Sequence, residues 1–131
     1  MHPEKKHSRA GRKALARARR ICLALPETHE KLAWGAPTFR LKKGKIFAMF
    51  EEDHHGDGRI ALWCHAPKGA QQVLVETEPK RFFRPPYVGP AGWIGVNLAE
   101  VDDARLEELV RDAWLVIAPR KLAAALDADP C

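Results

Sequence analysis

Apolar residues recur at spacings of three and four near the start of the chain, a period typical of an amphipathic α-helix. Ser8 is a suitable N-cap for this helix. Pro26 ends it, because the residue before a proline avoids helical dihedral angles. Cys22 falls on the apolar stripe and is predicted to be a core residue. The stripe consists of Ala14, Leu15, Ala18, Ile21, Cys22 and Leu25.

Short apolar runs separated by turn residues follow and predict β-strands. The runs cover residues 38–41, 45–50, 59–65 and 92–98. Turns are expected at Lys42-Lys43-Gly44 and at the Asp57-Gly58 step. Strands joined by such short turns must be antiparallel neighbours.

Two more amphipathic patterns predict helices in the second half of the chain. One covers residues 69–76, with Ala70, Val73 and Leu74 facing inward. The other begins at Asp102 or Asp103 and ends before Pro119, and residues 121–126 add a final turn or two. Its apolar face consists of Leu106, Leu109, Val110, Ala113, Trp114 and Ile117. The proline-rich and aromatic stretch 81–90 is expected to be an ordered loop.

This order of elements, α-β-β-β-α-β-α, predicts an α+β fold. An antiparallel sheet of this kind buries one face by packing against the amphipathic helices, which gives a two-layer domain. A chain of 131 residues is long enough for one such core, so residues 1–131 are predicted to form a single domain.

Composition narrows the class of protein without indicating its chemistry. Hydrophobic residues make up 46% and charged residues 30%, which is typical of a globular protein. No apolar run is long enough to span a bilayer and the N-terminus has no signal-like apolar segment, so we expect a cytoplasmic protein without membrane contact. Cys22, Cys64 and Cys131 are too few and too scattered for a disulfide framework.

Positive charge is concentrated at the N-terminus. Residues 1–20 contain eight basic residues and one acid, whereas the remainder has a net charge of −2, and the whole chain has +5. We therefore expect a basic N-terminal extension at about residues 1–10 and a basic face on the first helix, either of which could contact a polyanion. The candidate residues on the helix are Arg12, Lys13, Arg17 and Arg20. The alternative is a solvated face that keeps the protein soluble.

Several short sequence motifs are similar to those of the MmcQ/YjbR-like family. They are Leu25-Pro26-Glu27-Thr28, Trp34-Gly35-Ala36-Pro37-Thr38-Phe39, Gly44-Lys45-Ile46-Phe47-Ala48, the segment from Phe82 to Pro90 with Gly92-Trp93, and Ala118-Pro119-Arg120-Lys121-Leu122. These motifs occur in the family's order over about residues 20–125. The resemblance implies a small two-layer domain of secretion-chaperone-like architecture, and DNA binding with a double-wing arrangement. The chain departs from the family in its longer basic N-terminal segment and in the His54-His55 turn.

The predicted function is DNA binding through phosphate contacts. Arg40, Lys42, Lys43 and Lys45 surround one tight turn, as expected of a wing. Arg81 and Arg84 flank Phe82 and Phe83, a mixture of cations and rings that is suited to stacking on bases. The alternatives are that these rings pack into the core and that the lysine turn is merely solvated.

A groove between sheet and loop is the second hypothesis. Trp34, Phe39, Tyr87 and Trp93 could line it and accept a peptide or a small ligand. A sheet face could also support a homodimer, so both monomer and homodimer remain open.

No metal site, cofactor or catalytic residue is predicted. The acids and histidines at Asp53, His54, His55, Asp57 and His65 include neighbours that point to opposite sides of an extended chain. The same alternation separates Cys64 from His65. Phosphate-binding and nucleophile-elbow motifs are absent from the sequence, and Ser8 is its one serine. The protein is therefore expected not to be an enzyme.

Overall fold

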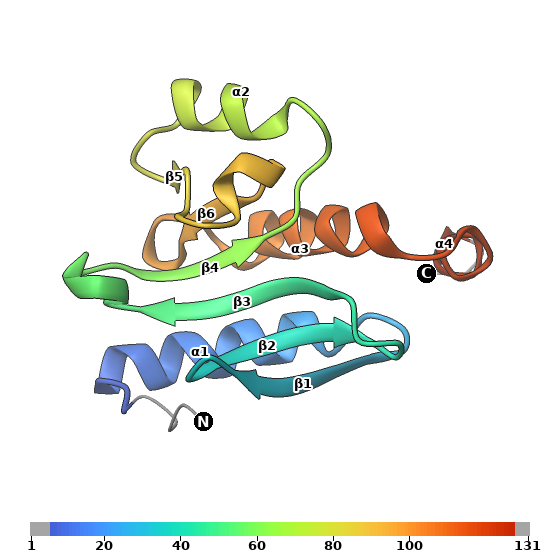
Figure 1. Ribbon diagram of the computed structural model, residues 1–131, viewed down its shortest axis with the longest axis horizontal. Coiled ribbons are helices and arrows are strands. Elements are labelled where there is room, and N and C mark those ends of the chain that lie inside the picture. The colour runs from blue at the N-terminus through green and yellow to red at the C-terminus, as the bar shows by residue number, and fades with distance from the viewer. Residues whose placement is uncertain (1–5, 128–131) are drawn as a thin grey trace.

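A six-stranded antiparallel sheet forms the centre of the protein, and helices pack on it (Figure 1). The structure, a computed structural model, describes residues 6–127. The strand order is β1-β2-β3-β4-β6-β5. The strands are β1 Thr28–Ala33, β2 Ala36–Leu41, β3 Ile46–Glu52, β4 Ile60–Cys64, β5 Phe82–Phe83 and β6 Ile94–Asn97. The α-helices are α1 Arg9–Cys22, α2 Ala70–Thr77, α3 Asp103–Ile117 and α4 Arg120–Asp127. The expected α+β class is confirmed.

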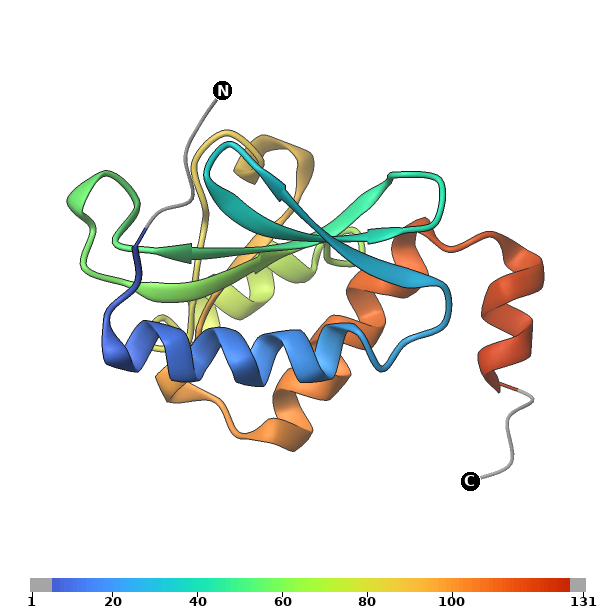
Figure 2. The same cartoon turned by 90° about the horizontal axis from the view of Figure 1, so that it is seen from below.

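Helices α1 and α3 lie side by side on one face of the sheet (Figure 2). Their apolar stripes bury Leu15, Ala18 and Trp114 against inward-facing strand residues such as Leu62 and Val96, which form the main core. The indole of Trp114 donates a hydrogen bond to the carbonyl of Pro26, 3.2 Å away, and so ties α3 to the segment after α1. The predicted burial of Cys22 is confirmed, and burial raises the pKa of its thiol.

Two strands were not predicted. β1 precedes the first expected strand, and its sequence THEKLA has few apolar residues because it is an edge strand with half of its side chains exposed. Glu30, at its centre, faces α1 and pairs with Arg19 at 2.5 Å. β5 consists of two residues within the stretch predicted to be a loop.

A β-bulge adjusts the sheet where β2 meets β3. Phe39 pairs with Ala48 but Arg40 pairs with Ile46, so Phe47 is the extra residue on β3. The bulge lets two consecutive side chains, Phe47 and Ala48, both join the main core. Simple alternation along the strand does not predict this placement.

The predicted helix ends are close to those observed. Ser8 caps α1 by accepting a hydrogen bond from the Gly11 amide, and Asp102 caps α3 by accepting one from the Arg105 amide. The predicted inward face of α2 is wrong at Val73, which is 58% exposed. α2 packs at the β5 edge of the sheet rather than on its face, so its contacts with the core come from Leu74 and Val75.

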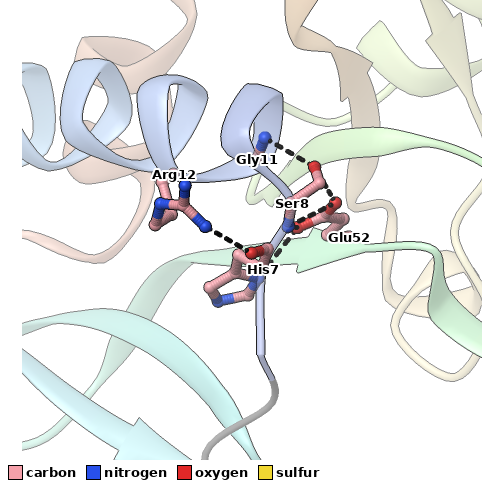
Figure 3. Close-up of polar contacts among 5 residues, drawn as sticks. All are labelled: His7, Ser8, Gly11, Arg12 and Glu52. Atoms are coloured by element: carbon pink, nitrogen blue, oxygen red, sulfur yellow. Dashed lines mark hydrogen bonds and ion pairs between the residues drawn. The ribbon is translucent and has the colours of Figure 1, made fainter.

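The start of α1 is fastened to β3 by the carboxylate of Glu52 (Figure 3). This carboxylate accepts hydrogen bonds from the Ser8 hydroxyl at 2.5 Å and the Ser8 amide at 3.2 Å, and lies 3.0 Å from Nδ1 of His7. Burial raises the pKa of Glu52, but the hydrogen bonds from Ser8 and His7 outweigh it and leave a net lowering. Gly11 is needed beside it, because a Cβ there would collide with the carboxylate.

Candidate aromatic pocket

The face of the sheet opposite α1 and α3 contains a pocket of about 750 Å³. A second, smaller cluster of buried residues forms its base, with Met49, Trp63 and Trp93 at the centre. The β1–β2 turn and the loop over residues 84–92 rise on this side of the sheet (Figure 2). The pocket therefore lies between two protruding segments and the surface of the strands.

Two exposed aromatic side chains contribute to the pocket wall from these segments. Trp34 is 69% exposed and Tyr87 is 74% exposed. Both have left-handed backbone conformations, with φ of 53° and 64°. Side chains with a Cβ rarely adopt this conformation, which costs roughly 1–2 kcal/mol.

The position of Trp34 follows from a two-residue turn. Ala33 pairs with Ala36, and both Trp34 and Gly35 have positive φ, which is the pattern of a type I′ hairpin turn. Asn is preferred at the first position of such a turn, and a tryptophan there is unfavourable. The fold itself gains little from this ring, since most of its surface faces solvent.

The pocket contains a polar group that the fold does not satisfy. The indole nitrogen of Trp63 is buried and has no hydrogen-bond partner among the residues that the structure describes. An unpaired buried donor costs about 1–3 kcal/mol. The imidazole of His54 packs edge-on against this indole, with 4.8 Å between the ring centroids.

Two histidines line the pocket beside Tyr87. His54 and His55 lie in a short 3₁₀ turn, His54–Gly56, so they do not alternate as they would in an extended chain. Nε2 of His55 is 3.1 Å from the Tyr87 hydroxyl, and its own φ is 50°. His54 lies 4.0 Å from Glu51, which also lines the pocket. This wall therefore offers hydrogen-bonding groups next to the rings.

Three of the four residues predicted to line a groove do line this pocket, namely Trp34, Tyr87 and Trp93. The prediction for Phe39 is wrong, because this side chain is fully buried in the main core beneath α1 and α3. Sequence reasoning did not find Met49, Trp63 or the two histidines. Alternation along β4 was the available signal, since it places Ala61 and Trp63 opposite Leu62 and Cys64.

The lysine turn between β2 and β3 is exposed to solvent, as expected. Lys42, Lys43 and Lys45 are exposed, and within residues 6–127 they form no ion pair. Arg40 donates hydrogen bonds to Thr38 and to the Gly44 carbonyl, so its charge is not neutralised by an acid. Arg40 alternates with Ala36 along β2 and hence lies on the pocket face of the sheet.

The basic residues of α1 have a different environment. Arg17 binds Asp103 at 2.5 Å and the carbonyls of Leu98 and Val101 at 2.7 and 2.6 Å. Arg20 binds the same carboxylate at 3.0 Å. Hydrogen bonds from both guanidinium groups lower the pKa of Asp103. Arg12 donates to the His7 carbonyl, while Lys13 is exposed.

The lysine turn and α1 do not form one continuous basic surface. α1 lies below the sheet in Figure 2 and the β2–β3 turn lies above it, so the sheet separates the two basic regions. The twist of the β1–β2–β3 meander carries the turn away from the helical layer.

The second predicted pair of cations lies at the other edge of the sheet. Arg81 bonds to the Glu100 carbonyl and pairs with Glu78 at 3.7 Å, and the side chain of Arg84 packs over Gly89. Phe82 and Phe83 are both buried, so the alternative that these rings pack into the core is confirmed.

Other candidate chemistry is not assembled in the described residues. No three His, Cys, Asp or Glu side chains between residues 6 and 127 are grouped as metal ligands. Cys64 lies in the main core, where burial raises the pKa of its thiol to about 12, whereas His65 packs against Trp93 on the other face. Cys131 lies outside the described residues, and none of the described helices is long and apolar enough to span a membrane.

Comparisons with known proteins agree on the family and the fold. The family model YjbR matches residues 23–116. Uncharacterized proteins of Mycobacterium tuberculosis and Mycobacterium bovis are each 31% identical over 94 residues, which cover 72% of this chain and 71% of theirs. The crystal structure of a Deinococcus radiodurans protein with a DUF419 domain superposes with a TM-score of 0.66 at 17% identity, covering 85% of this chain and 86% of that one.

Proposed function

The chain belongs to the YjbR family, and we propose from its own site that it is a binding protein whose pocket takes a planar, uncharged ring system. Trp34 carries this proposal. A large aromatic side chain occupies a turn position that favours Asn, stays 69% exposed, and lies beside a pocket of about 750 Å³. An outlier of this kind suggests a residue kept for a ligand rather than for stability.

The character of the pocket wall favours a flat and neutral ligand. Four aromatic side chains, those of Trp34, Trp63, Tyr87 and Trp93, offer ring faces and edges for stacking. Among the described residues no Lys or Arg lines the pocket, so an anionic group would be desolvated there without a counter-charge. This composition is typical of small-molecule sites, which combine apolar walls with a few polar groups.

Binding rather than catalysis is the role we propose. The thiol of Cys64 is turned into the opposite core and so does not lie beside the pocket histidines, and we assign the Tyr87 hydroxyl that contacts His55 to ligand binding. The histidines at the pocket contact Tyr87, Trp63 and Glu51. They are suited to hold a ligand by hydrogen bonds.

Intrinsic fluorescence offers a direct test, because three of the chain's four tryptophans line the pocket. Indole-free planar probes such as adenine and quinoline should quench the emission in a saturable manner. Trp34→Asn should weaken their binding roughly tenfold, since loss of one stacking ring costs about 1–3 kcal/mol. Absence of saturable binding by every planar probe would contradict the proposal.

Nucleic-acid binding through the lysine turn is the second candidate. The observation in its favour is that Lys42, Lys43 and Lys45 are exposed and that no acid within the described residues pairs with them, unlike Arg17 and Arg20 of α1. Cations that the fold leaves without counter-charge can release counterions from phosphates. A salt titration of oligonucleotide binding tests it, and lack of association at low ionic strength would exclude it.

A further inference from the structure

We propose that the pocket receives an unpaired nucleobase of a single-stranded nucleic acid whose phosphates continue onto the lysine turn. This inference rests on the proposed pocket function and identifies its ligand. It joins the two candidate surfaces into one site on the sheet face opposite α1 and α3.

The polar groups of the pocket select among planar ligands. The polar side chains of the wall include Glu51, His54 and His55, whereas the indole N–H of Trp63 is buried beneath the pocket surface and is not available to a ligand. A nucleobase has ring nitrogens and carbonyl oxygens in its plane, and it stacks on aromatic side chains through its faces.

The histidine wall adds donors and acceptors that match a base edge. His54 and His55 are held at the pocket by ring contacts with each other and by the contact of His55 with the Tyr87 hydroxyl. Each neutral imidazole has one donor and one acceptor nitrogen. Every nucleobase presents both kinds of group along its edges, so either tautomer can be used.

Basic residues lie at the end of β3 that leads away from the pocket. Ile46 and Met49 of β3 line the pocket, and Lys45 directly precedes Ile46. Met49 is four positions after Lys45, a span of at most about 13 Å at 3.3 Å per residue. A single-stranded nucleic acid with one base in the pocket can therefore place its neighbouring phosphates at the lysine turn. Arg40 lies on the same face of the sheet.

The same geometry indicates single strands rather than a duplex. The planar group must enter between the protruding β1–β2 turn and the loop that carries Tyr87. A base within a duplex is stacked and paired, and has to leave the helix before it can enter such a pocket. A free nucleotide lacks the neighbouring phosphates that the lysine turn would contact.

Anisotropy of a labelled short oligothymidylate tests the proposal, with tryptophan quenching recorded in the same titration. The expected result is saturable binding at low salt together with quenching. Weaker binding, by roughly tenfold, is expected for Trp34→Asn and for a strand with abasic sites, because both remove the stacked contact. Lys42→Glu with Lys43→Glu should reduce the slope of log affinity against log salt by about 1.4, at roughly 0.7 for each phosphate contact.

A matched control variant distinguishes phosphate contacts at the lysine turn from an effect of the protein's net charge. Arg120 and Lys121 are exposed adjacent cations on α4, a helix that contributes no residue to the pocket lining. The double variant Arg120→Glu with Lys121→Glu makes the same change in net charge and should leave the salt slope unchanged. Equal slopes for the two double variants would overturn the proposed phosphate path.

The remaining outcomes distinguish this inference from the proposed function on which it rests. Equally tight binding of a duplex, of an abasic strand or of thymidine monophosphate would overturn the inference. Saturable quenching by quinoline with none by the oligonucleotide would also overturn it, while the pocket would remain a site for planar rings. Failure of quinoline, adenine and the oligonucleotide together would remove both.

Discussion

Single residues in this protein have conformations that the fold alone does not favour. Three of the five described non-glycine residues with positive φ, Trp34, His55 and Tyr87, line the same pocket, whereas Glu27 and Asp53 do not. Glycine or asparagine at such positions would relieve the backbone with little loss of buried surface, since each of these side chains is largely exposed. The concentration of strained backbone in one wall therefore supports a role in binding.

Replacing Trp34 with Asn should stabilise the protein. Asn tolerates the left-handed conformation that this type I′ turn requires, and little buried surface is lost with a ring that is 69% exposed. We expect the free energy of unfolding to rise by about 1 kcal/mol. Urea denaturation measures the change.

Trp34→Ala provides the control for that substitution. It removes the same ring but keeps a Cβ without the local hydrogen bonding of Asn, so it should give a smaller gain or none. A Trp34→Asn variant no more stable than Trp34→Ala would show that the turn is not strained.

At the scale of elements, sequence patterns predict the parts whose burial is one-sided. The apolar stripes of α1 and α3 follow from periodicity, because each helix has one face in the main core. The strands β2, β3 and β4 have buried residues on both faces and are indicated instead by short apolar runs between turn residues. β1 escapes detection because its alternate side chains are polar, with Glu30 satisfied by Arg19 from α1. That pairing depends on two segments brought together only by folding.

The pocket shows the same limit of sequence reasoning. The motifs that contain Trp34, Tyr87 and Trp93 can be recognised in the sequence. The exposure of Trp34 and Tyr87 follows from the geometry of the turn and the loop that carry them. Phe39 looks equivalent to them, but the register of β2 turns it toward the helices. Alternation along β4 separates Trp63 from Leu62 and Cys64, but β4 is buried on both faces, so its continuous apolar run does not indicate which side faces the pocket.

The contact between α1 and β3 provides a test by a double-mutant cycle. Gly11→Ala should destabilise the otherwise unchanged protein by about 1 kcal/mol, because the added Cβ displaces Glu52 from Ser8 and His7. In a Glu52→Ala background the same substitution should stabilise by up to about 1 kcal/mol, since Ala is then favoured in the helix. The unfolding free energies of the four proteins measure the coupling, and additive effects would contradict it.

Glu52 should also contribute to acid sensitivity. Its pKa is lowered in the folded protein, because hydrogen bonds from Ser8 and His7 outweigh the opposing effect of burial. A lowered folded pKa contributes stability that is fully present above the ordinary value of 4.5 and is lost as the pH falls below it through the folded value. The free energy of unfolding, measured as the pH falls below 4.5, should decrease less in Glu52→Gln than in the unchanged protein. An identical decrease in the two proteins would exclude the Glu52 carboxylate as a source of acid sensitivity.

At the scale of the whole molecule, the two faces of the sheet use positive charge differently. On the helical face Arg17 and Arg20 share Asp103, and Arg19 pairs with Glu30. On the pocket face Arg40 and the lysine turn have no acid paired to them within residues 6–127. The basic residues behind the net charge of +5 thus include some that hold elements together and some that are available to a ligand.

Arg17→Ala distinguishes these two uses of charge. Its guanidinium joins α1 to the carbonyls of Leu98 and Val101 and to Asp103, and its side chain is 22% exposed. Its removal should lower the free energy of unfolding by about 1–2 kcal/mol, since several charge-assisted hydrogen bonds are lost together. Chemical denaturation measures this effect, and Lys13→Ala on the same helix, which removes an exposed cation, should change stability by less than about 0.5 kcal/mol.

The same variant should leave any nucleic-acid affinity and its salt slope unchanged once the protein is folded, because α1, which carries Arg17, lies beneath the sheet in Figure 2 and Asp103 already matches the charge of Arg17. Lys42→Glu with Lys43→Glu should behave in the opposite way, with unaltered stability and a reduced slope. A loss of salt dependence in Arg17→Ala would mean that α1 takes part in binding. The helical face would then have to be included in the site, and the division of charge between the two faces would be wrong.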